Sequence, residues 1–170
     1  MIGSNPGTLP GAETHPEQAA FRLLDSRHQS VCFAESCTGG LLCATLVCVP
    51  GASRVLEESH VTYSDAAKHR VLGVSEETLQ RHTAVSAPCA LEMARGARQV
   101  SGADWGVSTT GYAGPDGGED GTPVGTVFIA VSGPGGDTVT QHRFPGSREQ
   151  VRNLAVTTAL EALVRRMEAR

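Results

Sequence analysis

The sequence has few aromatic residues and no long apolar or basic run. Aromatic side chains make up 4% of its 170 residues, so a core would consist mainly of Val, Leu and Ala. No apolar run approaches the roughly 20 residues of a membrane helix, and the N-terminus lacks a signal-peptide pattern. A net charge of −4 without a basic cluster disfavours binding to nucleic-acid phosphates. We therefore expect neither a membrane nor a nucleic-acid partner.

Metal-binding and disulfide patterns are also missing. The cysteines number five, an odd count, and no two of them form a C-x-x-C pair. The histidines at 60, 69, 82 and 142 show no mutual metal-ligand spacing. We expect small buried thiols in a reducing, cytoplasmic protein that needs no metal or cofactor. Cys37 is the exception, because a thiol at a helix N-terminus can be acidified.

The order of apolar segments predicts one α/β domain. Residues 1–14 are rich in Gly, Pro, Ser and Asn and are interpreted as a disordered tail, so the domain spans residues 15–170. Helices are expected at 16–26, 38–48, 76–82, 87–100 and from about 147, and one more runs from an N-cap at Ser64 with Asp65 to a stop near Gly73. Strands are expected at 31–35, 60–63, 104–109, 126–131 and 137–144. The segment Gly133-Pro134-Gly135-Gly136 favours a hairpin, hence an antiparallel strand pair. The fold class is a three-layer α/β/α domain with a mixed central sheet.

The segment Ala34-Glu35-Ser36-Cys37-Thr38-Gly39-Gly40-Leu41 is the first candidate site. It places a serine between a predicted strand and a predicted helix. Free backbone N–H groups of a first helical turn can stabilise an oxyanion or bind an anion. The alternative is an ordinary strand-to-helix turn in which Ser36 or Thr38 is the helix N-cap.

Tyr63-Ser64-Asp65-Ala66-Ala67-Lys68 is the second candidate. Ser64 is expected to cap a helix, and Lys68 near its positive end would have a lowered pKa. Such a lysine can take a proton from a serine hydroxyl, with Tyr63 relaying the proton or orienting the amine. The alternative is a solvated surface lysine beside a tyrosine at a strand end.

A glycine-rich stretch, Thr109 to Gly118, follows the next predicted strand. Ligands of open α/β sheets bind at the carboxyl ends of strands, and glycines allow backbone N–H groups to approach phosphate closely. The stretch matches neither a P-loop nor a G-x-G-x-x-G pattern. The alternative, which the composition alone favours, is a long surface loop.

The C-terminal helix carries apolar residues on two faces. Val151, Leu154, Ala155, Thr158 and Ala162 share one face, and Val156, Leu160, Leu163, Val164 and Met167 lie roughly opposite. A surface helix needs only one apolar stripe. One explanation is a homo-oligomer with this helix in its interface, and the other is burial against helices of the same chain.

Taken in order, the motifs resemble one family. To the two candidate sites are added the segments Val49-Pro50-Gly51-Ala52-Ser53, Leu72-Gly73-Val74, Ala84-Val85-Ser86, Met93-Ala94-Arg95-Gly96-Ala97, Thr110-Gly111-Tyr112-Ala113-Gly114-Pro115 and Pro123-Val124-Gly125-Thr126-Val127. This series is similar to the CinA C-terminal domain, the nicotinamide-nucleotide amidase (PncC) family, over residues 16 to 168. The resemblance implies hydrolysis of nicotinamide mononucleotide to nicotinate mononucleotide and ammonia, in pyridine-nucleotide recycling.

The resemblance also implies roles for particular residues. Ser36 would be the nucleophile and Lys68 the general base, with Tyr63 relaying or positioning the proton and no metal. The turn formed by Cys37, Thr38, Gly39 and Gly40 would supply oxyanion donors. The nucleotide would be held by residues of the glycine-rich loop, namely Thr110, Gly111, Ala113 and Gly114.

The sequence departs from the family pattern at two places, and the first of them keeps a second function open. Glu58-Ser59-His60 replaces two glycines and a small apolar residue, and Tyr112 replaces a common isoleucine. The alternative is therefore a relative that binds the nucleotide, as a regulator, without turning it over. A third reading makes Cys37 the nucleophile. The N-terminal molybdopterin-like domain of full-length CinA proteins is not present in this sequence, which suggests a stand-alone form or an excised domain.

Overall fold

The structure is a computed structural model that describes residues 15–169, so the predicted tail 1–14 lies outside the described residues. Its centre is a five-stranded sheet in the order β2-β1-β3-β4-β5. The strands are β1 (Val31–Glu35), β2 (Leu56–Val61), β3 (Trp105–Gly111), β4 (Thr126–Gly133) and β5 (Gly136–Arg143). Strands β2, β1 and β3 run parallel, whereas β4 pairs antiparallel with both β3 and β5. The predicted mixed sheet and its β4–β5 hairpin are confirmed.

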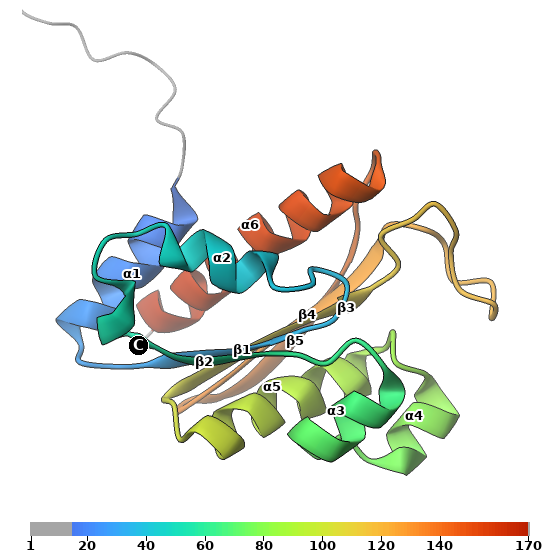
Figure 1. Cartoon of the computed structure of the whole chain (residues 1–170), viewed down its shortest axis with the longest axis horizontal. Helices are drawn as coiled ribbons and strands as arrows, with labels where there is room; N and C mark the ends of the chain where they lie inside the picture. The colour runs from blue at the N-terminus through green and yellow to red at the C-terminus, as the bar shows by residue number, and fades with distance from the viewer. Residues whose placement is uncertain (1–14, 170) are drawn as a thin grey trace, which may run out of the picture.

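Helices cover both faces of this sheet (Figure 1). One layer holds α1 (Pro16–Ser26), α2 (Leu41–Val47) and α6 (Arg148–Glu168), and the other holds α3 (Asp65–Leu72), α4 (Glu76–His82) and α5 (Ala87–Ser101). A short 3-10 helix, Ala52–Arg54, precedes β2. The predicted three-layer α/β/α architecture is confirmed.

Two predicted elements differ from the structure near the candidate site. Helix α2 begins at Leu41 rather than at residue 38, because Gly39 and Gly40 have φ angles of 58° and 99°. This left-handed backbone cannot continue a right-handed helix, and glycine adopts it at little cost. Strand β2 ends at Val61, so Tyr63 lies beyond the strand and not within it. Pairing with β1, from Leu56 to Val61, determines these bounds and is invisible in the local pattern.

Strand β1 is buried on both faces along its whole length. Val31 and Phe33 belong to the core cluster that includes α6, whereas Cys32 and Ala34 pack in the cluster that includes α5 residues such as Met93. This alternation follows from the two-residue period of a strand. The core therefore holds β1 firmly, and the residue that follows it, Ser36, starts from a fixed point.

The two apolar faces of α6 are largely covered by the chain itself. Helix α6 packs against β3 and β4 on one side and contacts α1 and α2 on others. Of its predicted apolar residues, Leu154 alone is exposed. Burial within the chain thus accounts for most of the pattern, and a homo-oligomer through this helix stays a prediction.

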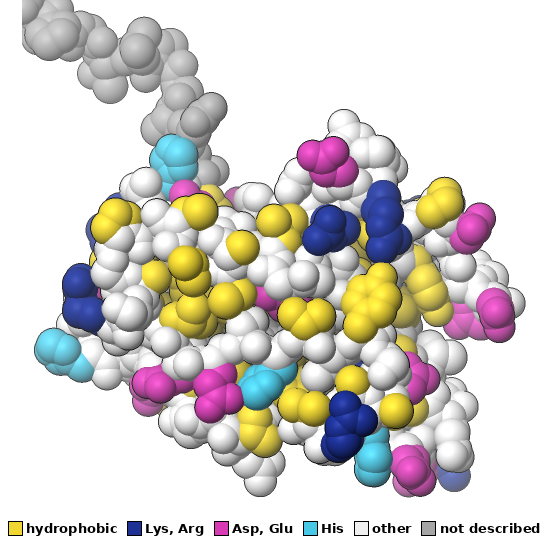
Figure 2. Space-filling model, in the orientation of Figure 1, with side chains coloured by type: hydrophobic (Ala, Val, Ile, Leu, Met, Phe, Trp, Pro, Cys, Tyr) yellow, Lys and Arg dark blue, Asp and Glu magenta, His cyan; other side chains and the backbone are white. Residues whose placement is uncertain are grey.

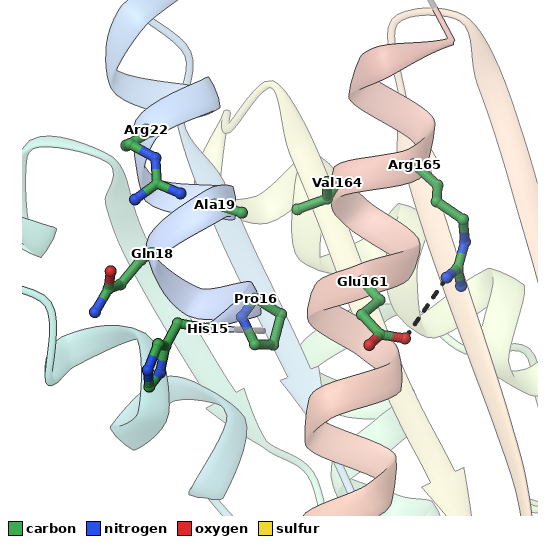
Figure 3. A pocket seen from close by; sticks show the side chains of 8 residues that line it. All are labelled: His15, Pro16, Gln18, Ala19, Arg22, Glu161, Val164 and Arg165. Carbon is green, nitrogen blue, oxygen red and sulfur yellow. Dashed lines mark ion pairs between the residues drawn. The ribbon is translucent and has the colours of Figure 1, made fainter. Parts of the chain in front are cut away.

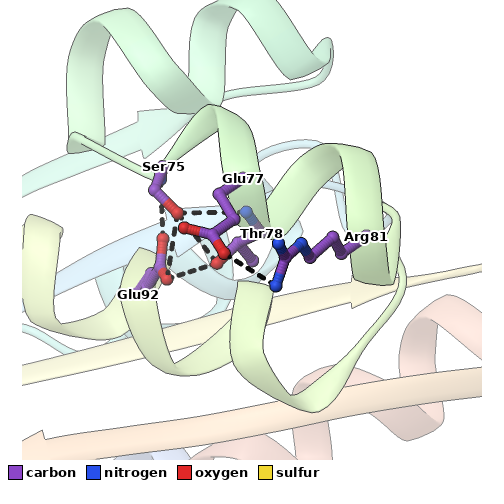
Figure 4. Close-up of polar contacts among 5 residues, drawn as sticks. All are labelled: Ser75, Glu77, Thr78, Arg81 and Glu92. Carbon is purple, nitrogen blue, oxygen red and sulfur yellow. Dashed lines mark hydrogen bonds and ion pairs between the residues drawn. The ribbon is translucent and has the colours of Figure 1, made fainter.

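Glu92 of α5 organises the start of α4. Its carboxylate accepts hydrogen bonds from the Ser75 N–H at 2.7 Å and from the hydroxyls of Ser75 and Thr78 (Figure 4). On the exposed side of α4, Glu77 and Arg81 form an i,i+4 ion pair. An acidic side chain near a helix N-terminus is favoured by the helix dipole. The same device recurs at the candidate site.

Candidate functional site

The carboxyl ends of the three parallel strands meet at one edge of the sheet. Ser36 follows β1, and its N–H donates to the Thr109 carbonyl of β3 at 2.9 Å. On the other side, the Thr62 N–H donates to the Glu35 carbonyl at 2.9 Å. The predicted residues from three distant segments therefore converge at the edge where open α/β sheets bind ligands. Val61, Tyr63 and Val124, from the segments that form or flank this edge, are exposed. Figure 2 shows hydrophobic and positively charged side chains next to one another on the face in view.

Ser36 and Lys68 are in direct contact. The Lys68 Nζ atom lies 3.0 Å from the Ser36 Oγ atom. Lys68 reaches it from α3, whose N-cap Ser64 accepts a hydrogen bond from the Ala67 N–H as predicted. The alternative of a solvated surface lysine is excluded, because Lys68 is 1% exposed.

The surroundings of Lys68 favour its neutral form. Burial lowers the pKa of the Lys68 amine, and this is a stronger cause than any neighbouring charge. Nζ also donates to the carbonyls of Thr62 at 2.8 Å and Tyr63 at 3.4 Å. A neutral amine has two N–H donors and one lone pair, so two carbonyls and one hydroxyl donor satisfy it. The lone pair can then accept the Ser36 proton.

Tyr63 joins the site through an arginine that the sequence reading missed. Its side chain is 61% exposed, and its hydroxyl accepts a hydrogen bond from Arg148 at 3.1 Å rather than from Lys68. Arg148 also donates to the Gly114 carbonyl at 2.6 Å. The proton-relay role of Tyr63 stays a prediction. Arg148 follows the N-cap Ser147 of α6 directly, but nothing local in the sequence signals its partners.

Glu35 organises the turn that follows Ser36. The residue is fully buried, and its carboxylate accepts from the N–H groups of Gly40, Leu42 and Cys43 at 2.9–3.0 Å. It also accepts from the hydroxyls of Thr38 and Ser59. Neither Ser36 nor Thr38 is the N-cap of α2, because this carboxylate takes that role from the preceding strand. The local sequence pattern assigned no function to Glu35.

Fewer backbone N–H groups are free to bind an oxyanion than the sequence predicted. The Gly39 N–H donates to the Ser36 carbonyl at 3.1 Å, and the Gly40 N–H is bound to Glu35. Within residues 15–169, no hydrogen bond to another residue engages the N–H groups of Cys37 and Thr38. These two N–H groups directly follow the serine, so they are the ones available to a developing negative charge.

Cys37 has a side chain unsuited to nucleophilic attack. Burial raises the pKa of its thiol to about 12, so the thiol is protonated at neutral pH. The predicted acidification at a helix N-terminus is wrong in direction. The Cys37 nucleophile therefore loses its physical basis.

The glycine-rich loop lies beside the site, but several of the residues predicted to bind the nucleotide are buried or already hydrogen-bonded. Thr110 is fully buried, and its hydroxyl donates to the Ala84 carbonyl at 2.7 Å. A Cβ at Gly111 would lie 2.5 Å from the Thr126 carbonyl oxygen, so sheet packing explains that glycine. Ala113 is buried, and the Gly114 carbonyl is bound by Arg148. Contact of these four residues with a nucleotide stays a prediction.

The loop itself is ordered by its own hydrogen bonds. The Gly118 N–H donates to the Thr122 carbonyl at 2.8 Å, and the Gly125 N–H to the Tyr112 carbonyl at 2.7 Å. It projects beyond the end of the sheet (Figure 1). These hydrogen bonds give the loop a defined conformation.

The segment Glu58-Ser59-His60, where the sequence departs from the family pattern, lies in the edge strand β2. The Ser59 hydroxyl donates to Glu35 at 3.3 Å. The His60 Nε2 atom lies 3.0 Å from a carboxylate oxygen of Glu58. This segment is therefore connected to the site through the hydrogen bond between Ser59 and the buried Glu35.

A groove of about 500 Å³ lies elsewhere, between α1 and α6. Ala19 and Val164 face each other across it, and Glu161 pairs with Arg165 of its own helix (Figure 3). The catalytic candidates lie at the other end of α6, near Arg148 and Arg152. Nothing in the groove suggests chemistry.

Metal-binding clusters and membrane spans are not found in the part of the chain that the structure describes. Among residues 15–169, no three His, Cys, Asp or Glu side chains are grouped so that they could hold a metal ion. In the same range, no helix combines the length and the apolar character needed to cross a membrane.

Comparison with known proteins gives a consistent result. The profile of the CinA C-terminal domain matches residues 13–167. A CinA-like protein of Syntrophotalea carbinolica is 49% identical over 155 residues, which are 91% of this chain and 37% of that protein. The chain thus spans well under half the length of that curated relative.

Solved structures agree over nearly the whole chain. A CinA superfamily protein from Klebsiella pneumoniae superposes with a TM-score of 0.90 at 41% identity, covering 94% of this chain and all of that one. The competence/damage inducible protein CihA of Agrobacterium tumefaciens gives a TM-score of 0.81 at 39% identity, covering 94% and 98%. With fold, motifs and relatives in agreement, this chain belongs to the CinA C-terminal domain family.

Proposed function

We propose that the protein hydrolyses the carboxamide of nicotinamide mononucleotide, yielding nicotinate mononucleotide and ammonia. One observation carries the amidase chemistry: a buried lysine amine with a lowered pKa lies 3.0 Å from the hydroxyl of Ser36. The choice of a pyridine nucleotide rests on the family resemblance of the sequence.

In the first step, the Ser36 oxygen attacks the carboxamide carbon while its proton passes to the Lys68 amine. The negative charge that develops on the carbonyl oxygen is stabilised by the N–H groups of Cys37 and Thr38. The C–N bond then breaks. Ammonia leaves with the proton that Lys68 returns, and an ester with Ser36 remains.

In the second step, water attacks this ester and gives its proton to Lys68. The ester bond breaks, the Ser36 oxygen recovers that proton, and the acid product leaves as a carboxylate after giving its own proton to solvent. Both steps use the same base and the same oxyanion donors. No metal or cofactor takes part in this scheme.

The nucleotide would extend from Ser36 toward the glycine-rich loop. Arg148 supports this direction, because its guanidinium joins the Tyr63 hydroxyl to the Gly114 carbonyl. A cation at this position suits an anionic substrate. Tyr63 is in turn held where its exposed ring can contact the substrate.

The alternative is a nucleotide-binding relative without turnover. The observation behind it is that Ser59, one of the residues that depart from the family pattern, donates to Glu35, which holds the catalytic turn. Binding of nicotinamide mononucleotide without ammonia release would establish this alternative.

The deciding experiment is an ammonia-release assay across a panel of pyridine nucleotides, with calorimetric titration of the same compounds. We expect turnover of nicotinamide mononucleotide. Calorimetric binding of that nucleotide without ammonia release would reject the amidase, and the absence of both would reject the substrate class.

We also propose a cytoplasmic homo-oligomer assembled through α6. The remaining exposed apolar residue of its predicted faces, Leu154, is the observation that supports an interface there. Light scattering tests it, and a strictly monomeric elution would remove the idea.

A further inference from the structure

Arg152 binds the backbone of the serine turn from the side of α6. Its Nε atom donates to the Cys37 carbonyl at 3.2 Å, and its Nη2 atom donates to the Thr38 carbonyl at 2.8 Å. Within residues 15–169, no ion pair with a carboxylate involves this guanidinium. The guanidinium thus donates hydrogen bonds to two consecutive peptide groups.

These two contacts determine how the peptide planes face. In a trans peptide, the carbonyl and the N–H of the next residue point in opposite directions. The only cis bond among the described residues is Gly114–Pro115, so the Cys37–Thr38 peptide is trans. Because Arg152 binds the Cys37 carbonyl from α6, the Thr38 N–H faces away from α6.

The second contact locks the neighbouring peptide. Arg152 binds the Thr38 carbonyl, and the N–H of that peptide, on Gly39, donates to the Ser36 carbonyl at 3.1 Å. A Cβ atom at Gly39 would lie 3.6 Å from the guanidinium, so the arginine packs closely on this glycine. Glu35 holds the N–H groups further along the turn. The turn is therefore fixed by Arg152 through its carbonyl groups and by Glu35 through its N–H groups.

We propose that Arg152 is a positioning residue that keeps the Thr38 N–H directed at the oxyanion of the reaction. This inference rests on the proposed amide hydrolysis at Ser36. Oxyanion donors are effective because they are oriented before charge develops. Without Arg152, the Cys37–Thr38 peptide can rotate, and the donor must be reoriented during each turnover.

The chain offers a matched control in Arg166. This residue lies on the same helix, and its Nη2 atom donates to the carbonyls of Gly135 at 3.4 Å and Gly136 at 2.9 Å. At 1.5 Å per residue, it is roughly 21 Å further along the helix. Arg166→Ala therefore removes the same type of contact without touching the serine turn.

The test compares kcat and KM for nicotinamide mononucleotide in the wild type, Arg152→Ala, Arg152→Lys, Arg166→Ala and Arg166→Lys. We expect Arg152→Ala to lower kcat by about tenfold to a hundredfold with KM within about threefold, because a transition-state donor is misplaced. Arg152→Lys should recover part of kcat, and both Arg166 variants should keep it. Thermal midpoints separate a loss of folded protein from a loss of rate, and the two lysine variants decide the matter if an alanine variant does not fold.

A second readout does not depend on the natural substrate. A fluorophosphonate forms a bond between the Ser36 oxygen and phosphorus, with fluoride leaving and the serine proton passing to Lys68. The tetrahedral adduct places a negatively polarised oxygen where the oxyanion forms, so labelling should slow in the Arg152 variants only. Equal kcat and labelling rates in the Arg152 and Arg166 variants would overturn the inference, as would a rise in KM alone.

The two proposals fail differently. A wild type that is labelled at Ser36 but releases no ammonia from the nucleotide rejects the substrate, and labelling rates still test Arg152. An active wild type whose kcat and labelling are insensitive to Arg152 rejects only the positioning role. A wild type that shows neither labelling nor turnover rejects both.

Discussion

The Lys68 amine lies 3.0 Å from the Ser36 hydroxyl, although 32 residues separate them in the sequence. Ser36 directly follows the buried strand β1, and Lys68 lies in a helix of the opposite layer from α2 and α6. The contact requires the β1–β2 pairing and the docking of α3. It is the relationship on which the proposed chemistry depends.

Ser36→Ala should abolish ammonia release while leaving the fold and nucleotide binding in place. The hydroxyl is the proposed nucleophile, and loss of such a group lowers kcat by about three orders of magnitude or more. An ammonia-release assay measures the loss of turnover, and calorimetry on the same preparation measures whether nucleotide binding is retained. Undiminished turnover would refute the serine assignment.

The pH dependence should follow the protonation of Lys68. Because burial lowers the pKa of this amine, kcat/KM should rise with pH along a limb whose midpoint lies below the ordinary lysine value of about 10.4. Lys68→Arg is the matched variant, since a guanidinium keeps its proton throughout this range. It should lose activity at every pH, and a variant that recovers at alkaline pH would contradict the role.

The same pKa shift predicts a change of stability with pH. Between the folded-state pKa of Lys68 and about 10.4, the unfolded chain holds a proton that the folded chain has lost. The free energy of unfolding therefore falls as pH decreases through this window. Denaturant titrations should show Lys68→Met gaining stability relative to the wild type as pH falls, and a pH-independent difference would argue against the lowered pKa.

Glu35→Gln should weaken both fold and activity. The amide replaces one acceptor oxygen by an N–H donor, which then meets backbone N–H groups of Gly40, Leu42 or Cys43. We expect a loss of about 2–4 kcal/mol in the free energy of unfolding, measured by urea titration. Glu92→Gln is the control, because that carboxylate also organises a helix start but lies at α4. It should destabilise the fold and leave kcat unchanged, whereas equal kcat losses in both variants would assign the effect to stability alone.

Cys37→Ala should retain kcat within about tenfold, because a thiol of raised pKa is no nucleophile at neutral pH. A thiol-alkylating reagent should modify the exposed Cys48 and spare the buried Cys37. Peptide mapping with an activity assay checks both. Loss of turnover that parallels Cys37 alkylation would restore the thiol as a candidate.

The sequence by itself determined the layers, the approximate position of each helix and strand, and Ser36, Tyr63 and Lys68 as candidates. Periodicity and turn residues are local, so α1, β1 and α4 match their predicted bounds. The order of the motifs also identified the family, because many short motifs that match in the same order along the chain are far more specific than any single motif.

Only the tertiary structure decided how the candidates are arranged. The lowered pKa of Lys68 comes mainly from burial, whereas the local pattern had pointed to the helix dipole. The partners of the serine turn, Glu35 and Arg152, act through backbone groups that carry no side-chain signature, and Arg152 lies 115 residues from Cys37. Backbone N–H and carbonyl groups are the same at every residue except proline. Which of them stay free, and where they face, is therefore determined by packing of distant segments and cannot be read from residue types.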